Sequence, residues 1–173
     1  PYFLFIGRLE ERKNVARIIE AFELVKEKHG IPHALVLVGK PGYGYEKIAH
    51  RKRESKRQED IIELGYVSEE EKWKLLHEAD VFVFPTLYEG FGIPVLEAQA
   101  TGAPVVTSCV SSLPEVAGNG ALLVDPTDAE AISQAMWQLT SDEELKNGII
   151  REGKENVKRF SWEKCAREIA GVM

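Results

Sequence analysis

Short apolar runs alternate along the chain with longer amphipathic segments. The apolar runs occupy residues 2–7, 34–39, 61–67, 81–86, 104–109 and 121–126. The run ALVLVG at 34–39 is continuously apolar rather than alternating, which is typical of a strand covered on both faces. We therefore predict that these runs are buried strands, with the weakest pattern in IIELGYV.

The segments between the runs have helical periodicity. Residues 14–29 place apolar side chains at helical spacing, and Gly30 follows as a stop signal. A charged helix is expected to reach about residue 58, and Ser68 with Glu71 forms a capping box for a helix ending near Ala79. Further helices are predicted in the stretch that ends near Gly102 and at 113–118, 128–140, 142–159 and 162–171.

This order of strands and helices predicts the fold. Apolar strands alternating with amphipathic helices form parallel sheets with helices on both faces, and right-handed crossovers make such sheets doubly wound. We predict an α/β, Rossmann-like domain. The sequence has no repeat, low-complexity tract or internal linker, so residues 1–173 are expected to form one domain.

Composition narrows the functional class. A formal net charge of -6 argues against a nucleic-acid partner, which usually meets a basic surface. Cys109 and Cys165 are the only cysteines, so no disulfide framework or paired-cysteine metal motif is expected, and a cytoplasmic location is favoured. The chain opens with Pro1 rather than Met, and we interpret it as part of a longer protein.

Two cations follow the first predicted strand. In GRLEERKN, Arg8 leaves the strand and Lys13 precedes the next helix. Ligands of doubly wound sheets bind at the carboxyl ends of strands, and cations beside a helix start suit a diphosphate. The alternative is that both are solvated charges paired with Glu10 and Glu11.

The stretch YEGFGIPVLEAQATG follows the fourth predicted strand. Gly90 and Gly92 permit close approach of the backbone to a ligand, and Pro94 fits the first turn of a helix. The free N–H groups of that helix start would face an anion. A second anion-binding element is therefore predicted at the same edge of the sheet.

Two acids flank this turn. Glu89 precedes it and Glu97 lies about one turn inside the helix. At about 1.5 Å per helical residue, the two carboxylates can lie roughly a diphosphate apart. Acids at both ends with amides and cations between them match a nucleotide sugar, which has hydroxyls at both ends. The alternative is a surface acid and a helix-capping acid.

Three segments carry a resemblance to a known family. They are GRLEERKN, the run from LGYVSEEEKW to GAPVVTS, and SSLPEVAGNGALLVDP. Together they resemble the group-one (family four) retaining nucleotide-sugar glycosyltransferases, from Tyr2 to about Trp162. The resemblance implies a GT-B-type protein with two Rossmann-like domains facing a cleft. This chain is similar to the C-terminal, donor-binding half.

The resemblance implies roles for individual residues. Arg8 and Lys13 would hold the diphosphate and stabilise the leaving nucleotide, Glu89 would bind the hexose, and Glu97 the ribose. Glu89, Arg8 and Lys13 would then form the catalytic set, and no metal or other cofactor is required. The implied donor-binding residues are Gly7, Arg8, Lys13, Tyr66, Val67, Glu89, Gly90, Phe91, Gly92, Ile93 and Glu97.

The resemblance also implies an activity. The chain looks most similar to mannosyltransferases of polysaccharide or lipopolysaccharide assembly, so GDP-mannose is the expected donor and a saccharide or lipid-linked molecule the acceptor. UDP- or ADP-glucose, as in sucrose or glycogen synthesis, is the alternative. A sugar-nucleotide epimerase and a non-catalytic nucleotide-binding module are further alternatives from other classes.

An N-terminal acceptor domain would be the partner, and any membrane contact would be peripheral and made by that half. We expect this chain alone to be inactive.

Two points depart from the family pattern or stay open. GKPGYGYEK follows the second predicted strand where many members have Gly-Asp/Glu-Gly-Pro, which leaves the contacts of residues 39–43 undefined. This segment also lacks the GxGxxG spacing of NAD-binding folds. Retention of configuration is compatible with a covalent intermediate on Glu89 or with attack on the same face, and the sequence does not decide between them.

Three further features have simpler interpretations. His29 and His33 have metal-like spacing, but Gly30 and Pro32 lie between them, so structural roles are expected. The run HRKRESKR at 50–57 is interpreted as a solvated helix face. Trp162 is predicted to anchor the last helix in the core.

Overall fold

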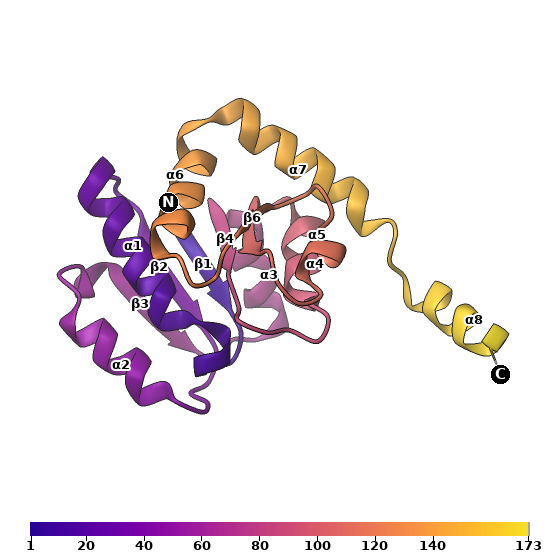
Figure 1. Cartoon of the computed structure of the whole chain (residues 1–173), viewed down its shortest axis with the longest axis horizontal. Coiled ribbons are helices and arrows are strands. Elements are labelled where there is room, and N and C mark those ends of the chain that lie inside the picture. Colours follow the sequence, from indigo (N-terminus) through magenta and orange to yellow (C-terminus); the bar gives the residue numbers. More distant parts are fainter. Residues whose placement is uncertain (173) are drawn as a thin grey trace.

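A six-stranded, all-parallel sheet lies at the centre of the computed structural model, which describes residues 1–172 (Figure 1). The strand order is β3-β2-β1-β4-β5-β6. The strands are β1 Tyr2–Ile6, β2 Ala34–Val38, β3 Ile61–Gly65, β4 Val81–Phe84, β5 Val105–Ser108 and β6 Leu122–Val124. This order, with a helix between successive strands, confirms the predicted doubly wound, Rossmann-like fold.

Helices cover both faces of the sheet (Figure 1). One layer holds α1 Val15–His29, α2 Tyr45–Glu54 and α6 Ala129–Ser141, and the other holds α3 Glu69–Glu78, α4 Ile93–Thr101 and α5 Leu113–Ala117. Two short 3₁₀ helices are η1 Glu11–Lys13 and η2 Gln58–Asp60. After α6, α7 Glu143–Val157 packs on α4, and α8 Trp162–Val172 follows.

Local signals in the sequence fix several element boundaries. Gly30 ends α1 in the left-handed conformation, with its N–H donating to the Lys26 carbonyl oxygen. Ser68 caps α3, and Glu71 completes the predicted capping box. Gly65 ends β3 with a φ of +70°, so this strand is shorter than the apolar run that predicted it.

The core lies around the two central strands. Phe3, Leu4 and Phe5 of β1 have no exposed surface, and neither do the four residues of β4. The edge strand β3 instead alternates, with Ile62 and Leu64 partly exposed. The continuous apolar runs thus mark strands that are covered by helices on both faces.

The prediction that Trp162 anchors the last helix in the core is wrong. Trp162 is 82% exposed. It begins α8, which extends away from the rest of the molecule (Figure 1). All residues from 162 to 171 are exposed. The amphipathic pattern predicted the helix correctly but carried no information about the surface on which that helix packs.

The two histidines have structural contacts, as expected. His33 contacts the Asp80 carboxylate and His29 stacks on Trp137. The 50–57 run is only partly the predicted solvated helix face, because α2 ends at Glu54 and Ser55 is buried. Cations of the 50–57 run pair with acids of neighbouring elements, namely Glu23, Glu27 and Glu63. Within the described part of the chain, no helix combines the length and apolar character that a membrane crossing requires.

Candidate functional site

The strand order places a topological switch point between β1 and β4. These strands are neighbours, but the chain leaves β1 for the layer of α1 and leaves β4 for the layer of α4. The two loops therefore diverge at the carboxyl edge of the sheet, which is the usual ligand position in doubly wound folds. Arg8, Lys13 and Glu89, predicted from the sequence, all lie on these two loops.

Lys13 and Glu89 meet at this switch point. Lys13 ends η1, is only 8% exposed and lies with its ammonium 5.0 Å from the centre of the Phe84 ring. The same ammonium donates to Oε2 of Glu89. The structure thus brings together one predicted cation and one predicted acid that are 76 residues apart in the chain.

Arg12 makes contacts in the site that were not predicted from the sequence. Its guanidinium donates to the Tyr88 carbonyl oxygen at 2.8 Å and lies 3.8 Å from Oε1 of Glu89. The Leu87 N–H donates to the Arg12 carbonyl oxygen at 3.0 Å. Arg12 therefore ties the loop after β1 to the loop after β4. Its position in the charged segment GRLEERKN was the only available signal.

Asn14 also connects the loop after β1 to the loop after β4. It is 8% exposed and adopts the left-handed conformation with a φ of 62°. Its side-chain N–H₂ group donates to the carbonyl oxygens of Pro85 at 2.9 Å and Pro126 at 2.7 Å. An asparagine tolerates this backbone conformation better than most residues. One buried amide therefore joins the loops that follow β1, β4 and β6.

Arg8 differs from Lys13 because its side chain is exposed and is free of ion pairs and hydrogen bonds within residues 1–172. Arg8 and Lys13 do not pair with Glu10 and Glu11, although the exposed Arg8 does match the solvated charge of that alternative. Glu10 pairs with Arg12 at 2.8 Å, and Glu11 pairs with Lys47 of α2 at 2.6 Å. Arg8 is thus available to an anion at this edge.

The loop after β2 supports the loop after β1. Leu9 N–H donates to the Lys40 carbonyl oxygen at 3.0 Å, and Gly42 N–H donates to the Leu9 carbonyl oxygen at 2.9 Å. Gly39 has a φ of +142°, and a Cβ there would lie 1.9 Å from the Gly7 carbonyl oxygen. Only glycine fits this position. The segment that departed from the family pattern therefore holds Arg8 in place from one side.

Two serine hydroxyls fix the turn at 88–92. Ser111 and Ser112 donate to the Glu89 carbonyl oxygen at 2.5 and 2.9 Å, and Ser112 also reaches the Phe91 carbonyl oxygen at 2.9 Å. Gly92 has a φ of +110° and caps α4. Both serines belong to the quoted segment SSLPEV, but their contact with the turn was not predicted.

The start of α4 is open. Its cap, Gly92, supplies no side chain, and Pro94 lies in the first turn as predicted. The first N–H groups of a helix carry partial positive charge and lack partners within the helix. This helix start therefore adds to the positive potential that Arg8 and Lys13 create at the carboxyl edge.

Glu97 belongs to a second, neighbouring cluster. It lies on α4 and accepts from Lys72 of α3 at 2.8 Å. Lys72 also contacts Glu69 at 2.8 Å. Burial opposes the charged form of Lys72, but hydrogen bonds to Glu69 and Glu97 prevail and raise its pKa. Lys72 thus fixes the Glu97 side chain between α3 and α4.

The residues predicted near the base follow β3. Tyr66 is 73% exposed, and the Lys40 ammonium lies 5.1 Å from the centre of its ring. Val67 is half-buried and packs against the core. Tyr66 thus presents an aromatic face on the same edge as Arg8, although the structure gives no direct contact between them.

A family model described as "Glycosyl transferases group 1" matches residues 1–156. The chain belongs to this family. It is 38% identical to O-antigen chain mannosyltransferase B of Escherichia coli over 96% of the chain and 44% of the relative. It is 30% identical to an uncharacterized glycosyltransferase of Methanocaldococcus jannaschii over 98% of the chain and 43% of that protein. This glycosyltransferase chain spans less than half the length of these relatives.

Solved structures agree on the fold of this glycosyltransferase chain. HepE of Anabaena, solved with UDP and glucose, superposes with a TM-score of 0.86 at 18% identity, over 99% of this chain and 47% of HepE. Sucrose-phosphate synthase of Thermosynechococcus elongatus gives 0.80 at 29% identity, over 99% and 44%. The fold is that of one half of a GT-B-type glycosyltransferase, as predicted.

Proposed function

We propose that this chain is the donor-binding half of a retaining hexosyltransferase that moves mannose from GDP-mannose to a saccharide or lipid-linked acceptor. The observation that carries the proposal is the partly buried contact between Lys13 and Glu89 at the switch point of the sheet, with the unpaired Arg8 on the same loop as Lys13. A fixed cation, a fixed acid and a free guanidinium at this edge suit the place where doubly wound folds bind ligands.

Lys13 and Arg8 bind the donor diphosphate in this proposal. An ammonium has three donors, and Lys13 uses one of them on Glu89, so two remain for phosphate oxygens. Arg8 is free to make bidentate contacts. As the bond to the sugar breaks, negative charge develops on the diphosphate, and fixed cations stabilise that charge. In this role the two side chains replace a divalent metal.

Glu89 positions the hexose. Lys13 and Arg12 fix its carboxylate, and its remaining lone pairs accept hydrogen bonds from sugar hydroxyls. We place it as a positioning and electrostatic group rather than a nucleophile, because both of its oxygens already face cations. The acceptor then attacks on the face that the diphosphate leaves, and the departing phosphate takes the acceptor's proton. Configuration is retained.

The nucleoside end of the donor lies toward α3 and β3. Glu97, held by Lys72, accepts from the ribose hydroxyls. Tyr66 and Val67 contact the base. The backbone from Gly90 to Ile93 reaches the sugar and phosphate, because the glycines leave its N–H groups accessible.

The names of relatives favour mannose. The similar E. coli proteins include serotype-specific mannosyltransferase WbdA at 29% identity as well as mannosyltransferase B. Glycogen synthase of Mycobacterium tuberculosis, also 29% identical, keeps a glucose donor as the second candidate. We further propose that a second domain of the full-length protein supplies the acceptor site, and that this protein acts in the cytoplasm, with any membrane contact peripheral.

Calorimetric titration with GDP, UDP and ADP tests this proposal. The wild-type chain should prefer GDP, and Lys13→Ala and Glu97→Ala should both weaken binding. Lys28→Ala is the matched control, because Lys28 also pairs with an acid but lies near the far end of α1. Preference for UDP or ADP would overturn the mannose donor and keep the site. A folded chain that binds none of the three nucleotides would contradict the proposed function.

A further inference from the structure

The turn at 88–92 contacts the end of α7 through an aromatic pair. The rings of Phe91 and Phe160 meet edge to face, with centroids 5.8 Å apart and an interplanar angle of 88°. Phe91 lies between the two glycines of the turn, and Phe160 lies in the short segment that joins α7 to α8. Two residues far apart in the chain are thus in contact beside the candidate donor site.

Phe160 is held by a hydrogen-bonded network at the end of α7. Asn156, which is 6% exposed, donates to Oε1 of Gln99 and to the Val116 carbonyl oxygen, both at 2.8 Å. Arg159 donates to Oδ1 of Asn156 at 2.7 Å, and its guanidinium lies 5.2 Å from the centre of the Phe160 ring. The Phe160 ring is therefore fixed relative to α4.

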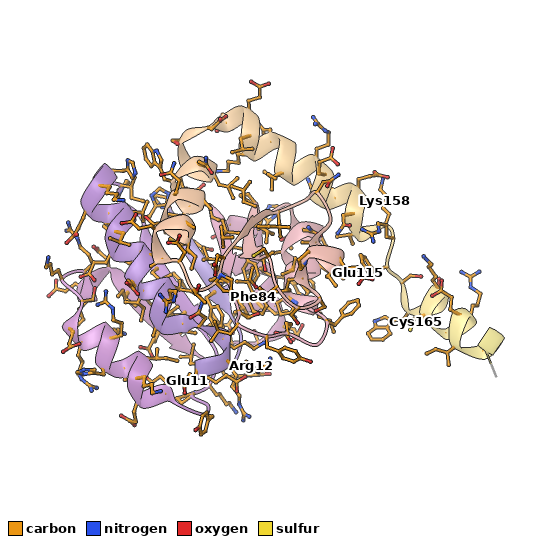
Figure 2. All side chains as sticks on the ribbon, in the orientation of Figure 1. Glu11, Arg12, Phe84, Glu115, Lys158 and Cys165 are labelled. Carbon is orange, nitrogen blue, oxygen red and sulfur yellow. The ribbon has the colours of Figure 1, made fainter. Side chains whose placement is uncertain are left out.

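The same hydrogen-bonded network includes α4. Gln99 is on α4, is 1% exposed and also donates to the carbonyl oxygens of Ala117 and Gly120. Phe91 immediately precedes α4 in the chain and packs on the far end of the same network. Figure 1 shows α7 passing over α4 and α5, and Figure 2 labels Lys158 at its end. We call Asn156, Arg159 and Phe160 the α7 brace.

We propose that Phe160 is a positioning residue that holds the Phe91 turn in its donor-binding conformation, so that the segment joining α7 to α8 is coupled to donor binding. This inference rests on the proposed function, because the turn is the part of that site which reaches sugar and phosphate. Its physical basis is that the serine hydrogen bonds hold the backbone of the turn, whereas the edge-to-face aromatic contact holds the Phe91 side chain between its two glycines.

Hydrogen exchange of the 173-residue chain tests the brace without any ligand. Phe160→Ala should speed exchange in peptides covering 88–93, while peptides from β1 and β2 keep the wild-type rate and show that the fold persists. Phe160→Tyr keeps the ring and should restore slow exchange. Trp162→Ala is the matched control, because it removes an exposed aromatic ring two residues further on. Unchanged exchange at 88–93 in Phe160→Ala would overturn the inference.

Titration with GDP-mannose then measures the coupling. Phe160→Ala should weaken binding by about 3- to 10-fold, the size expected for loss of one aromatic pair, and GMP should be affected less because it lacks the hexose and the second phosphate. Phe160→Tyr and Trp162→Ala should bind as wild type does. Equal loss for GDP-mannose and GMP would contradict positioning. If the wild-type chain binds neither GDP-mannose nor GMP, the proposed function is contradicted. The hydrogen-exchange comparison then tests by itself whether Phe160 holds the turn.

Discussion

Two buried lysines at opposite edges of the sheet show how differently the fold uses the same side chain. Lys13 and Lys26 are each 8% exposed, and each lies near a phenylalanine ring, at 5.0 and 5.5 Å. Lys26, near the end of α1, bonds to Asp60 and to the His33 carbonyl oxygen, both at 2.8 Å. Lys13 has Glu89 as its one hydrogen-bond acceptor within residues 1–172. Lys26 thus uses its donors within the fold, whereas Lys13 keeps donors for a ligand.

The surroundings of the two lysines extend this contrast. At the amino edge, Asp80 accepts from His33 at 2.8 Å and from Lys146 of α7 at 2.7 Å. Its N–H donates to the Tyr2 carbonyl oxygen. At the carboxyl edge, Arg8 is unpaired and the start of α4 lacks a capping side chain. The amino edge thus satisfies its charges internally, and the carboxyl edge leaves several of them exposed.

The largest expected effect comes from glycines at the two edges. Gly39→Ala places a Cβ 1.9 Å from a backbone oxygen, so we expect a loss of about 3 kcal/mol or more in the free energy of unfolding. Gly30→Ala, also in the left-handed region but with open space around it, should lose only about 1 kcal/mol. Urea unfolding of both variants measures the difference, and equal losses would contradict it.

Exchanging the two lysines for methionine separates binding from stability. Lys13→Met should lose about 10- to 100-fold in GDP affinity, because a hydrogen bond to a charged group contributes about 1.5–3 kcal/mol. Lys26→Met should lose about 1–3 kcal/mol of stability, because the His33 carbonyl oxygen loses its partner. Its GDP affinity should stay within about twofold of wild type. Calorimetry and urea unfolding measure the two effects.

The comparison fails if both variants lose GDP affinity in proportion to their stability. In that case Lys13 would act on the ligand only through the fold. The double variant Lys13→Met/Glu89→Gln sharpens the test, because it also removes the carboxylate that loses its hydrogen-bonded cation in Lys13→Met. It should recover stability without recovering GDP binding.

The sequence predicted the elements and the edge of the sheet at which the candidate residues meet. These predictions rest on local signals, namely the apolar runs of the strands, Gly30 at the end of α1 and the capping box of Ser68. Each signal depends only on residues that are close in sequence. The positions of Arg8 and Glu89 followed from topology, because the carboxyl ends of parallel strands meet at one edge. Their roles in donor binding stay predictions.

The contacts between distant segments were not predictable in the same way. Asn14 bridges three loops, and Lys72 holds Glu97 across two helices. Each depends on how one helix is rotated relative to another, which a pattern within a single element does not specify. The prediction for Trp162 was wrong for a related reason, because amphipathicity does not identify the surface on which a helix packs.

A smaller effect is expected at the nucleoside end of the carboxyl edge. Glu97→Gln should lower GDP affinity by about tenfold, because a neutral acceptor forms weaker bonds to the ribose hydroxyls than a carboxylate. The affinity for 2′,3′-dideoxy-GDP should be the same in wild type and variant. Glu115→Gln, an exposed acid on α5, is the matched control (Figure 2). An equal loss with the dideoxy nucleotide would show that Glu97 acts through Lys72 and the packing of α3 on α4.

The smallest effect concerns acid sensitivity at the amino edge. The hydrogen bond from His33, together with Lys146, holds the pKa of Asp80 well below its usual range despite partial burial. A carboxyl group whose pKa is lower in the folded chain stabilises the fold above its ordinary pKa, and this stabilisation is lost as the pH falls through the folded value. Asp80→Asn should therefore cost about 1 kcal/mol at neutral pH, after allowance for solvent screening.

The pH profile of that difference is the decisive measurement. Urea unfolding at pH 7, 5, 4 and 3 should show wild type and Asp80→Asn converging only below about pH 4, because the ordinary pKa of aspartate is about 3.9. Lys146→Met removes one cause of the low pKa, so the pH-dependent part of its stability should be smaller than in wild type and should be lost completely at a higher pH. GDP affinity should be unchanged in both variants at pH 7. A difference in stability that stays constant with pH would mean that Asp80 acts through packing, and the amino edge would then not depend on closed charge networks.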